Sequence, residues 1–234
     1  MSLHALPARE VVRATPRTRI IRLDTGGEPF GFAAGQAVMA GLQGSPLRKP
    51  YSIASAPGDV AATGLLELLV QVDESGAPDP HLERALPGTM LDIDGPFGRF
   101  TLDPLPEGRP VLFVAGGTGI APLRAMLRDL LSRPAARRIS LAYSARAVDE
   151  FAYRDELEAL ADAGRLDLRL TLTRPDAGWP GLKGRVDQRL LESLLPGGPR
   201  CYLCGPPAFV ADAAAMLIAA GVPTADVVVD DYSG

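Results

Sequence analysis

Three short segments of the sequence combine residue types that can bind nucleotides. The first, Lys49-Pro50-Tyr51-Ser52, places a cation, an aromatic ring and a hydroxyl on one apparent strand. Tyr51 can stack on a flat heterocycle, Ser52 can donate a hydrogen bond to it, and Lys49 can neutralise a phosphate. Because residues i and i+2 of a strand share a face, Lys49 and Tyr51 are predicted to face the same ligand. An ordinary amphipathic edge strand is the alternative interpretation, and the neighbouring Arg48 is an alternative phosphate partner.

The second segment, Gly116-Gly117-Thr118-Gly119-Ile120-Ala121-Pro122, follows a wholly apolar run at 111–115 that is typical of a central parallel strand. Glycines let the backbone turn tightly and approach an anion, and a helix that begins near Ile120 presents free N–H groups to it. The segment therefore predicts a pyrophosphate site, although it does not match the G-x-G-x-x-G fingerprint. A glycine-rich turn without a ligand is the alternative.

The third segment, Cys204-Gly205-Pro206-Pro207, ends another apolar strand just before a helix. Ligands of open α/β sheets sit beyond the carboxyl ends of strands, so this turn and the glycine segment are predicted to line the same crevice. Alternatively, Gly-Pro-Pro simply ends a strand and starts a helix. Cys201 and Cys204 have CxxC spacing, but residues three apart on a strand point to opposite faces, which disfavours a redox disulfide.

The elements that must position these segments divide at a proline-rich stretch, residues 103–108. Before it, short β-branched runs between Gly, Pro and Asp turns predict a small antiparallel barrel interrupted by one helix, with strands at 11–13, 19–23, 36–40, 51–55, 65–72 and 89–93. After it, strands and helices alternate, which predicts a doubly wound parallel sheet with helices on both faces. Its expected strands are 111–115, 139–144, 166–173, 200–204 and 227–229, and its expected helices are 120–131, 153–161, 186–194 and 208–219. We therefore expect a β domain at 1–103 and an α/β domain at 104–234.

Composition narrows the class of protein. With 234 residues, 47% hydrophobic and 22% charged, the chain is typical of a globular protein. A net charge of −4 predicts no nucleic-acid partner. Without a signal-like N-terminus or an apolar run of about 20 residues, we expect no integral membrane segment and a cytoplasmic protein. Two cysteines and two histidines predict no metal site and cannot ligate a four-cysteine iron–sulfur cluster.

The order and spacing of the three segments, together with a barrel followed by an α/β half and Tyr232 near the C-terminus, resemble the ferredoxin-NADP reductase family across nearly the whole chain. The resemblance implies an antiparallel flavin-binding β-barrel followed by a doubly wound nicotinamide-binding domain, in a stand-alone reductase without an iron–sulfur domain. It implies FAD as the bound cofactor, with FMN as the alternative, and NADP or NAD as the substrate.

The resemblance also assigns roles to individual residues. Tyr51 and Ser52 would contact the isoalloxazine ring, with Ser52 near its reactive N5, and Cys204 would lie near the nicotinamide. Tyr232 would cover the flavin, so Ser52, Cys204 and Tyr232 are the expected catalytic residues. Further flavin contacts are expected from Lys49, Ile53, Ala54, Ser55 and Gly76. Nicotinamide cofactor contacts are expected from Gly117, Thr118, Gly119, Pro122, Gly205 and Pro206.

Two positions depart from the family's pattern. Lys49 stands where arginine is common, and a lysine cannot make arginine's bidentate phosphate contact. Asp79 stands where the family has the hydroxyl residue of a helix start that holds the flavin pyrophosphate. Arg146 and Arg174 follow consecutive strands, where the family often binds the adenosine end. Arginine there favours a 2'-phosphate, with nearby carboxylates as the alternative partners of both side chains.

The activity implied by the resemblance is hydride transfer from NAD(P)H to flavin, followed by passage of single electrons to a separate acceptor protein, such as an iron–sulfur protein of the ferredoxin type. Two alternatives stay open. One is a flavin-deficient NAD(P)-binding or regulatory protein, motivated by Lys49 and Asp79. The other is a reductase of free flavin or ferric chelates.

Overall fold

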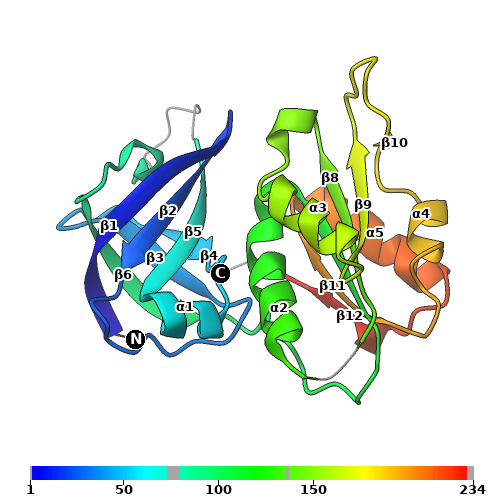
Figure 1. Cartoon of the computed structure of the whole chain (residues 1–234), viewed down its shortest axis with the longest axis horizontal. Coiled ribbons are helices and arrows are strands. Elements are labelled where there is room, and N and C mark those ends of the chain that lie inside the picture. Colours follow the sequence, from blue (N-terminus) through cyan, green and yellow to red (C-terminus); the bar gives the residue numbers. More distant parts are fainter. Residues whose placement is uncertain (1, 73–79, 135–136, 231–234) are drawn as a thin grey trace. The chain divides into compact units, whose positions relative to one another are not determined.

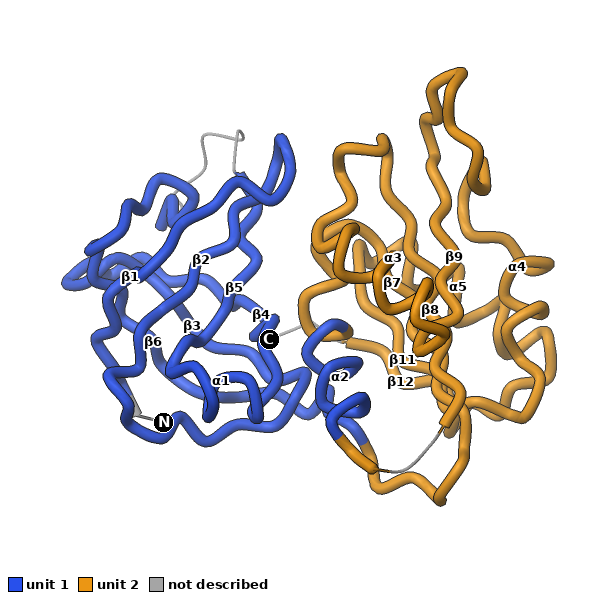
Figure 2. Tube along the Cα trace, viewed as in Figure 1, with its two compact units in different colours: residues 1–102, 124–132 blue, residues 103–123, 133–234 orange. Residues whose placement is uncertain are grey.

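The computed structural model describes residues 2–72, 80–134 and 137–230. The chain forms two compact units, residues 1–102 with 124–132, and residues 103–123 with 133–234 (Figure 2). Helix α2 (Ile120–Ser132) is divided between them. Its first turn belongs to the second unit, and the rest of the helix belongs to the first.

The first unit is an antiparallel sheet of six strands in the order β4-β3-β6-β1-β2-β5 (Figure 1). A bridge between Ile53, just after β4, and Leu68 in β5 joins the two edges of this order and closes the sheet. The predicted barrel with one interrupting helix, α1, is therefore confirmed. Its elements are β1 (Ser2–Thr15), β2 (Thr18–Asp24), β3 (Ala37–Leu42), β4 (Lys49–Ser52), α1 (Pro57–Thr63), β5 (Leu65–Gln71) and β6 (Met90–Phe97).

Strand β1 is much longer than the predicted 11–13. Its residues 2–7 pair with β6, and its residues 8–15 pair with β2, with a register shift between Ala8 and Glu10. The two halves therefore have different partners, and no single alternating pattern extends along the strand. This is why the sequence indicated only the second half.

Helix α1 is held at its start by the Asp59 carboxylate. Its Oδ2 accepts a hydrogen bond from the Ala56 N–H at 3.1 Å, and both oxygens accept from Arg128 at 2.5 and 2.8 Å. Pro57 opens the first turn, and Gly64, with φ of 70°, ends the helix in the left-handed conformation. The hydrogen bonds from Arg128 hold the pKa of Asp59 below its ordinary value, against the opposing effect of partial burial.

We expect Asp59→Asn to lower the free energy of unfolding by about 1 kcal/mol at pH 7, because a helix-start contact and a partly exposed ion pair are lost. A carboxylate with a lowered folded pKa stabilises the protein above its unfolded pKa, and this contribution disappears as the pH falls through the folded value. The difference between the two proteins should therefore shrink below pH 3.8, the ordinary value for aspartate. Urea unfolding at pH 7 and pH 3 measures it, with the exposed Glu107→Gln as the control; a difference that does not depend on pH would contradict the ion-pair account.

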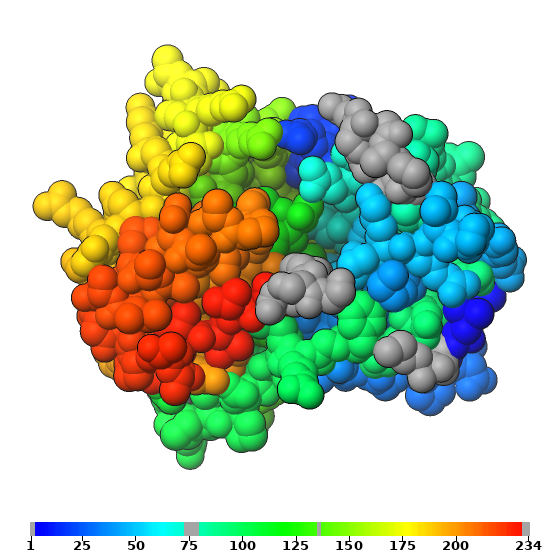
Figure 3. Space-filling view, turned by 180° about the vertical axis from the view of Figure 1, so that it is seen from behind, coloured from blue at the N-terminus to red at the C-terminus, as the bar shows by residue number. Residues whose placement is uncertain are grey.

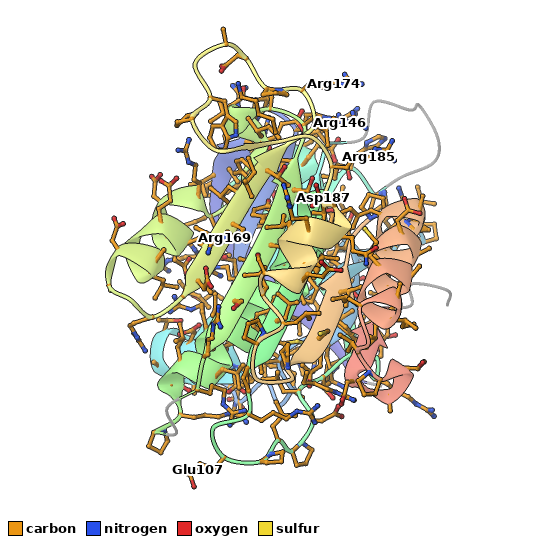
Figure 4. The ribbon with its side chains drawn as sticks, turned by 90° about the vertical axis from the view of Figure 1, so that its right-hand side faces the viewer. Glu107, Arg146, Arg169, Arg174, Arg185 and Asp187 are labelled. Carbon is orange, nitrogen blue, oxygen red and sulfur yellow. The ribbon has the colours of Figure 1, made fainter. Side chains whose placement is uncertain are left out.

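The second unit is a parallel sheet in the order β10-β9-β8-β7-β11-β12. Helices α4 and α5 cover one face and α3 lies on the other (Figure 4), so the predicted doubly wound fold is confirmed. Its elements are β7 (Val111–Gly116), β8 (Ile139–Ala145), α3 (Arg154–Asp162), β9 (Asp167–Leu172), β10 (Leu182–Lys183), α4 (Gln188–Glu192), β11 (Arg200–Cys204), α5 (Pro207–Ala219) and β12 (Val227–Val229).

Two elements near the edge of this sheet differ from the sequence prediction. Strand β10 was missed, because two residues are too few to produce a periodic pattern. Helix α4 is shorter than the predicted 186–194, since Asp187 caps it by accepting the Leu190 N–H at 2.8 Å. Val186 and Leu194 are buried in the core just outside the helix, which explains why the apolar pattern extended beyond both of its ends.

The apolar segment near the C-terminus is helix α5. Val210, Ala213 and Leu217 pack into the core of the second unit, while Ile218 on the outer side is 44% exposed. Figure 3 shows this outer surface, coloured orange to red. In the part of the chain that the structure describes, no helix is both long and apolar enough to cross a membrane.

Candidate functional site

The glycine segment and the Cys204 turn follow neighbouring strands. β7 and β11 pair in parallel, with Cys204 opposite Ala115 at their carboxyl ends. The chain moves from β7 to β8, β9 and β10 on one side, and then returns to β11 on the other side. The order of strands therefore reverses between β7 and β11, which is where open α/β sheets bind their ligands. The two turns therefore end neighbouring strands at this point of the sheet, and the shared crevice stays a prediction.

The two turns touch through their backbones. A Cβ on Gly119 would lie 2.2 Å from the Cys204 carbonyl oxygen and 2.6 Å from the Gly205 nitrogen. A Cβ on Gly205 would lie 3.1 Å from the Cα of Gly116. Only glycines allow such an approach. The sequence motifs at 116–119 and 204–205 are therefore two sides of one packed junction.

Gly117 forms the open part of this junction. It has a φ of +55°, is exposed, and has nothing within 4 Å of the position that a Cβ would occupy. It begins a short 3-10 turn, Gly117–Gly119, that leads directly into α2. Thr118 is half-buried and Pro122 is buried in the first turn of the helix. The structure therefore presents an accessible backbone and a helix N-terminus, the arrangement that binds phosphate groups.

Tyr143, in β8, holds this loop and was missed as a functional residue. Its buried hydroxyl donates to the Gly117 carbonyl at 3.2 Å and accepts from the Ala152 N–H at 3.2 Å. Burial raises the pKa of Tyr143, so the phenol stays protonated and keeps this donor. The only signal in the sequence was a tyrosine within an apolar strand, where a buried hydroxyl needs a partner.

Three exposed arginines lie beyond the carboxyl ends of β8, β9 and β10. The Arg174 N–H donates to the Arg146 carbonyl at 2.9 Å. Arg185 follows Gly184. The Gly184 N–H donates a hydrogen bond of 2.8 Å to the carbonyl of Leu172 and so holds this residue at the end of β9. Figure 4 shows the three at one end of the unit, with Glu107 at the opposite end.

Neither Arg146 nor Arg174 makes an ion pair within residues 2–72, 80–134 and 137–230. The alternative prediction, that nearby carboxylates pair with these two arginines, is therefore not met among these residues. Arg185 likewise lacks an ionic partner among these residues. It was missed in the sequence because it follows β10, a strand that was not predicted. The cluster therefore combines three exposed positive charges, none of which forms a salt bridge within the described residues.

Cys204 is fully buried at the end of β11. Its Sγ lies 3.3 Å from the Oδ2 of Asp230, a residue that sequence reasoning gave no role. Cys201 is also a free, buried thiol, and burial raises its pKa to about 12. Burial thus holds the Cys201 thiol protonated, unlike a reactive redox thiol.

In the barrel, β4 carries the predicted ring-binding residues. Lys49 and Tyr51 are half-buried while Pro50 between them is exposed, which agrees with the expected shared face. Tyr51 packs against the barrel core, and Ser52 is buried. Arg48 donates to Asp92 at 3.0 Å, so the alternative phosphate partner is already engaged in an ion pair.

The backbone after β4 is largely committed to the barrel itself. The Ile53 N–H donates to the Gln36 carbonyl at 2.9 Å, and the Ala54 N–H donates to the Glu67 carbonyl at 2.8 Å. The Ser55 hydroxyl accepts the Glu67 N–H at 3.1 Å. Flavin contacts from Ile53 and Ala54 would therefore have to use other atoms. Gly76, Asp79 and Tyr232 lie outside the described residues.

Comparison with known proteins gives the same two halves. The oxidoreductase FAD-binding domain family matches residues 5–102, and the oxidoreductase NAD-binding domain family matches residues 113–215. Ferredoxin–NADP reductase B of Sorangium cellulosum is 40% identical over 189 residues, which cover 76% of both proteins. The phenol hydroxylase P5 protein of Acinetobacter pittii is 30% identical over 215 residues, which cover 89% of this chain and 60% of that protein.

Among solved structures, a ferredoxin NADP+ reductase from Neisseria gonorrhoeae with bound FAD and NADP has the same fold, with a TM-score of 0.81 at 21% identity over 98% of both chains. The chain spans only 60% of the length of the Acinetobacter relative, so that protein is considerably longer. The matches to both domains and to the Sorangium protein lead to one conclusion: the chain belongs to the ferredoxin-NADP reductase family, as an NAD(P)H-dependent flavoprotein oxidoreductase with an FAD-binding barrel and an NAD-binding domain.

Proposed function

We propose that this protein takes electrons from NADPH and delivers them to a separate iron–sulfur protein of the ferredoxin type. Bound FAD supplies the chemistry that the side chains lack, since it accepts two electrons as a hydride and releases them one at a time. The observation that carries the proposal is the packed junction of Gly119 with Cys204 and Gly205 at the reversal of strand order. This junction belongs to a nucleotide site rather than to an ordinary turn.

In the second unit, each part of NADPH has a proposed partner. The exposed Gly117 and the start of α2 would hold the pyrophosphate, because free N–H groups and the positive end of the helix dipole favour it. Arg146, Arg174 and Arg185 would bind the 2'-phosphate through charge-assisted hydrogen bonds. Cys204, Gly205 and Pro206 would border the nicotinamide, and the protonated Tyr143 would keep the loop in place.

In the first unit, the residues of β4 fit a flavin. Tyr51 would contact the isoalloxazine ring, and its packing against the barrel core limits the positions of its own ring. Ser52 would donate a hydrogen bond near N5, and Lys49, on the same side of the strand as Tyr51, would neutralise a phosphate. The lysine ammonium is a point charge and cannot make the bidentate contact of a planar guanidinium. We therefore expect weaker phosphate binding than an arginine would give.

The names of two relatives favour a protein as the electron acceptor. One relative is named for a ferredoxin and another for a phenol hydroxylase, and both names point to an electron acceptor other than the reductase itself. The two cysteines of this sequence cannot ligate a four-cysteine cluster, so such a cluster would belong to the acceptor.

The test begins with the absorbance spectrum of the purified protein after reconstitution with FAD, and with identification of the extracted flavin. We expect stoichiometric FAD and rapid NADPH oxidation with a plant-type ferredoxin or ferricyanide. NADPH binding without flavin would support the regulatory protein instead. Turnover with free FMN or ferric citrate, combined with no reduction of ferredoxin, would support a reductase of small acceptors.

A further inference from the structure

A buried arginine on α2 contacts the segment proposed to bind flavin. The Nη1 of Arg124 donates to the Ala54 carbonyl at 2.8 Å and to the Oε1 of Glu67 at 2.9 Å. The side chains of Arg124 and Glu67 are only 10% and 7% exposed. All three residues belong to the first unit. A charged pair is costly to bury, so its position in the barrel needs an explanation.

The pair lies where the barrel closes. Ile53 bridges to Leu68, the Ala54 N–H donates to the Glu67 carbonyl, and the Ser55 hydroxyl accepts the Glu67 N–H. These few contacts join the end of β4 to β5, and we call this part of the barrel the β4–β5 seam. Arg124 adds a side-chain contact to each side of the seam, the Ala54 carbonyl on one and the Glu67 carboxylate on the other.

Glu67 is held from a second direction as well. Its Oε2 accepts from the Nε of Arg22 at 2.7 Å, and Arg22 in turn pairs with Glu10 at 2.6 Å. Each carboxylate oxygen of Glu67 therefore has its own arginine. Because both oxygens are engaged, the carboxylate cannot rotate freely, and it fixes the guanidinium of Arg124 against Ala54.

Arg124 belongs to the same helix as the proposed pyrophosphate loop. Helix α2 begins at Ile120, immediately after Gly117–Gly119, and continues without a break through Arg124 to Ser132. Four residues of helix rise by about 6 Å. The residue that holds Ala54 therefore lies on the helix that follows the glycine loop in the chain.

We propose that Arg124 is a positioning residue for hydride transfer, which rests on the function proposed above. It fixes the Ala54 carbonyl, and with it the strand end that carries Tyr51 and Ser52, to the helix that begins in the glycine loop. It acts through the backbone of Ala54 and through Glu67.

The test compares Arg124→Met with the wild-type protein, both loaded with FAD, by stopped-flow reduction with NADPH. We expect the limiting rate constant of flavin reduction to fall by about 100-fold, because a misplacement of about 1 Å can cost that much. The dissociation constant for NADPH and the FAD content should change little. Arg124→Lys keeps the positive charge but lacks the planar guanidinium. We expect its rate constant of flavin reduction to lie between those of Arg124→Met and the wild type.

Arg128→Gln is the matched control. Arg128 lies one turn further along α2 and also pairs with a carboxylate of the first unit, but that carboxylate belongs to Asp59 of helix α1 rather than to the β4–β5 seam. We expect this variant to lose some thermal stability and to keep the wild-type rate constant of flavin reduction. A rate loss in Arg128→Gln equal to that in Arg124→Met would reduce the role of Arg124 to general stability, and would overturn the proposal.

Two further results separate the possible failures. If the wild-type holoprotein is not reduced by NADPH, the proposed function itself is wrong. If the wild type is reduced and Arg124→Met is reduced at the same rate, only the positioning role is wrong. Should Arg124→Met not fold, Arg124→Lys and Glu67→Gln decide the matter, because a wild-type rate constant in both would overturn the proposal.

Discussion

Gly119→Ala is expected to lower kcat/KM for NADPH by about 100-fold or more, because a misplacement of about 1 Å can cost that much, while the protein retains its FAD. The added Cβ would lie 2.2 Å from the Cys204 carbonyl oxygen and 2.4 Å from its carbon, and both are backbone atoms that cannot rotate away. The turns after β7 and β11 would therefore have to separate. Overpacking of this kind also costs about 1–3 kcal/mol of stability. Steady-state kinetics with ferricyanide and a urea unfolding curve measure both effects.

Gly178→Ala is the control for Gly119→Ala. Gly178 lies in the same unit, and the nearest atom to its Cβ position is an Asp176 oxygen at 3.8 Å, which is an ordinary contact. We expect this variant to behave as the wild type. Unchanged kinetics in a folded Gly119→Ala protein would show that NADPH does not bind at this junction, since the loop could not keep its shape around the extra atom.

Removal of any one of the three arginines beyond β8, β9 and β10 is expected to lower kcat/KM for NADPH by roughly ten- to a hundredfold and to leave kcat/KM for NADH nearly unchanged. A hydrogen bond to a charged group contributes about 1.5–3 kcal/mol, and 1.4 kcal/mol corresponds to about a factor of ten. NADH lacks the 2'-phosphate and so loses nothing. Paired kinetics on Arg146→Ala, Arg174→Ala and Arg185→Ala measure the ratio.

Arg169→Ala is the matched control for these variants. Arg169 lies within β9, and its guanidinium pairs with Asp167 at 3.1 Å, away from the carboxyl end of the strand (Figure 4). We expect equal and small effects on the two coenzymes. Equal losses with NADPH and NADH in the three test variants would exclude a 2'-phosphate role for the cluster.

The sequence predicted those parts of the fold that depend on local patterns. β7 is wholly apolar because it is covered on both faces, and the bounds of β11 and β12 agree with the predicted strands. Parallel central strands and glycine turns carry their signal within a few neighbouring residues. For this reason the central strands of the α/β half could be predicted with little error.

The contacts that the sequence did not reveal are long-range ones. Arg124 and Glu67 are 57 residues apart, and each occupies an otherwise apolar pattern, where a charge gives no indication of its partner. Arg185 depends on β10, whose two residues have no period. Tyr143 was indistinguishable from a core residue until its hydroxyl was seen beside Gly117. These side chains obtain their roles from the tertiary fold, which no local window contains.

The division of α2 between the two units limits how this reductase can be recombined with others. A fragment that ends near residue 103 contains every strand of the barrel but lacks residues 124–132, which belong to the first unit. In such a fragment, Glu67 keeps only Arg22, and the Ala54 carbonyl loses its buried donor. A chimaera joined at the proline-rich linker must therefore include an arginine at the position of Arg124 in the donated half. No single break in the sequence separates the two units, because β7, which precedes α2, pairs with β8 and β11 in the sheet of the second unit.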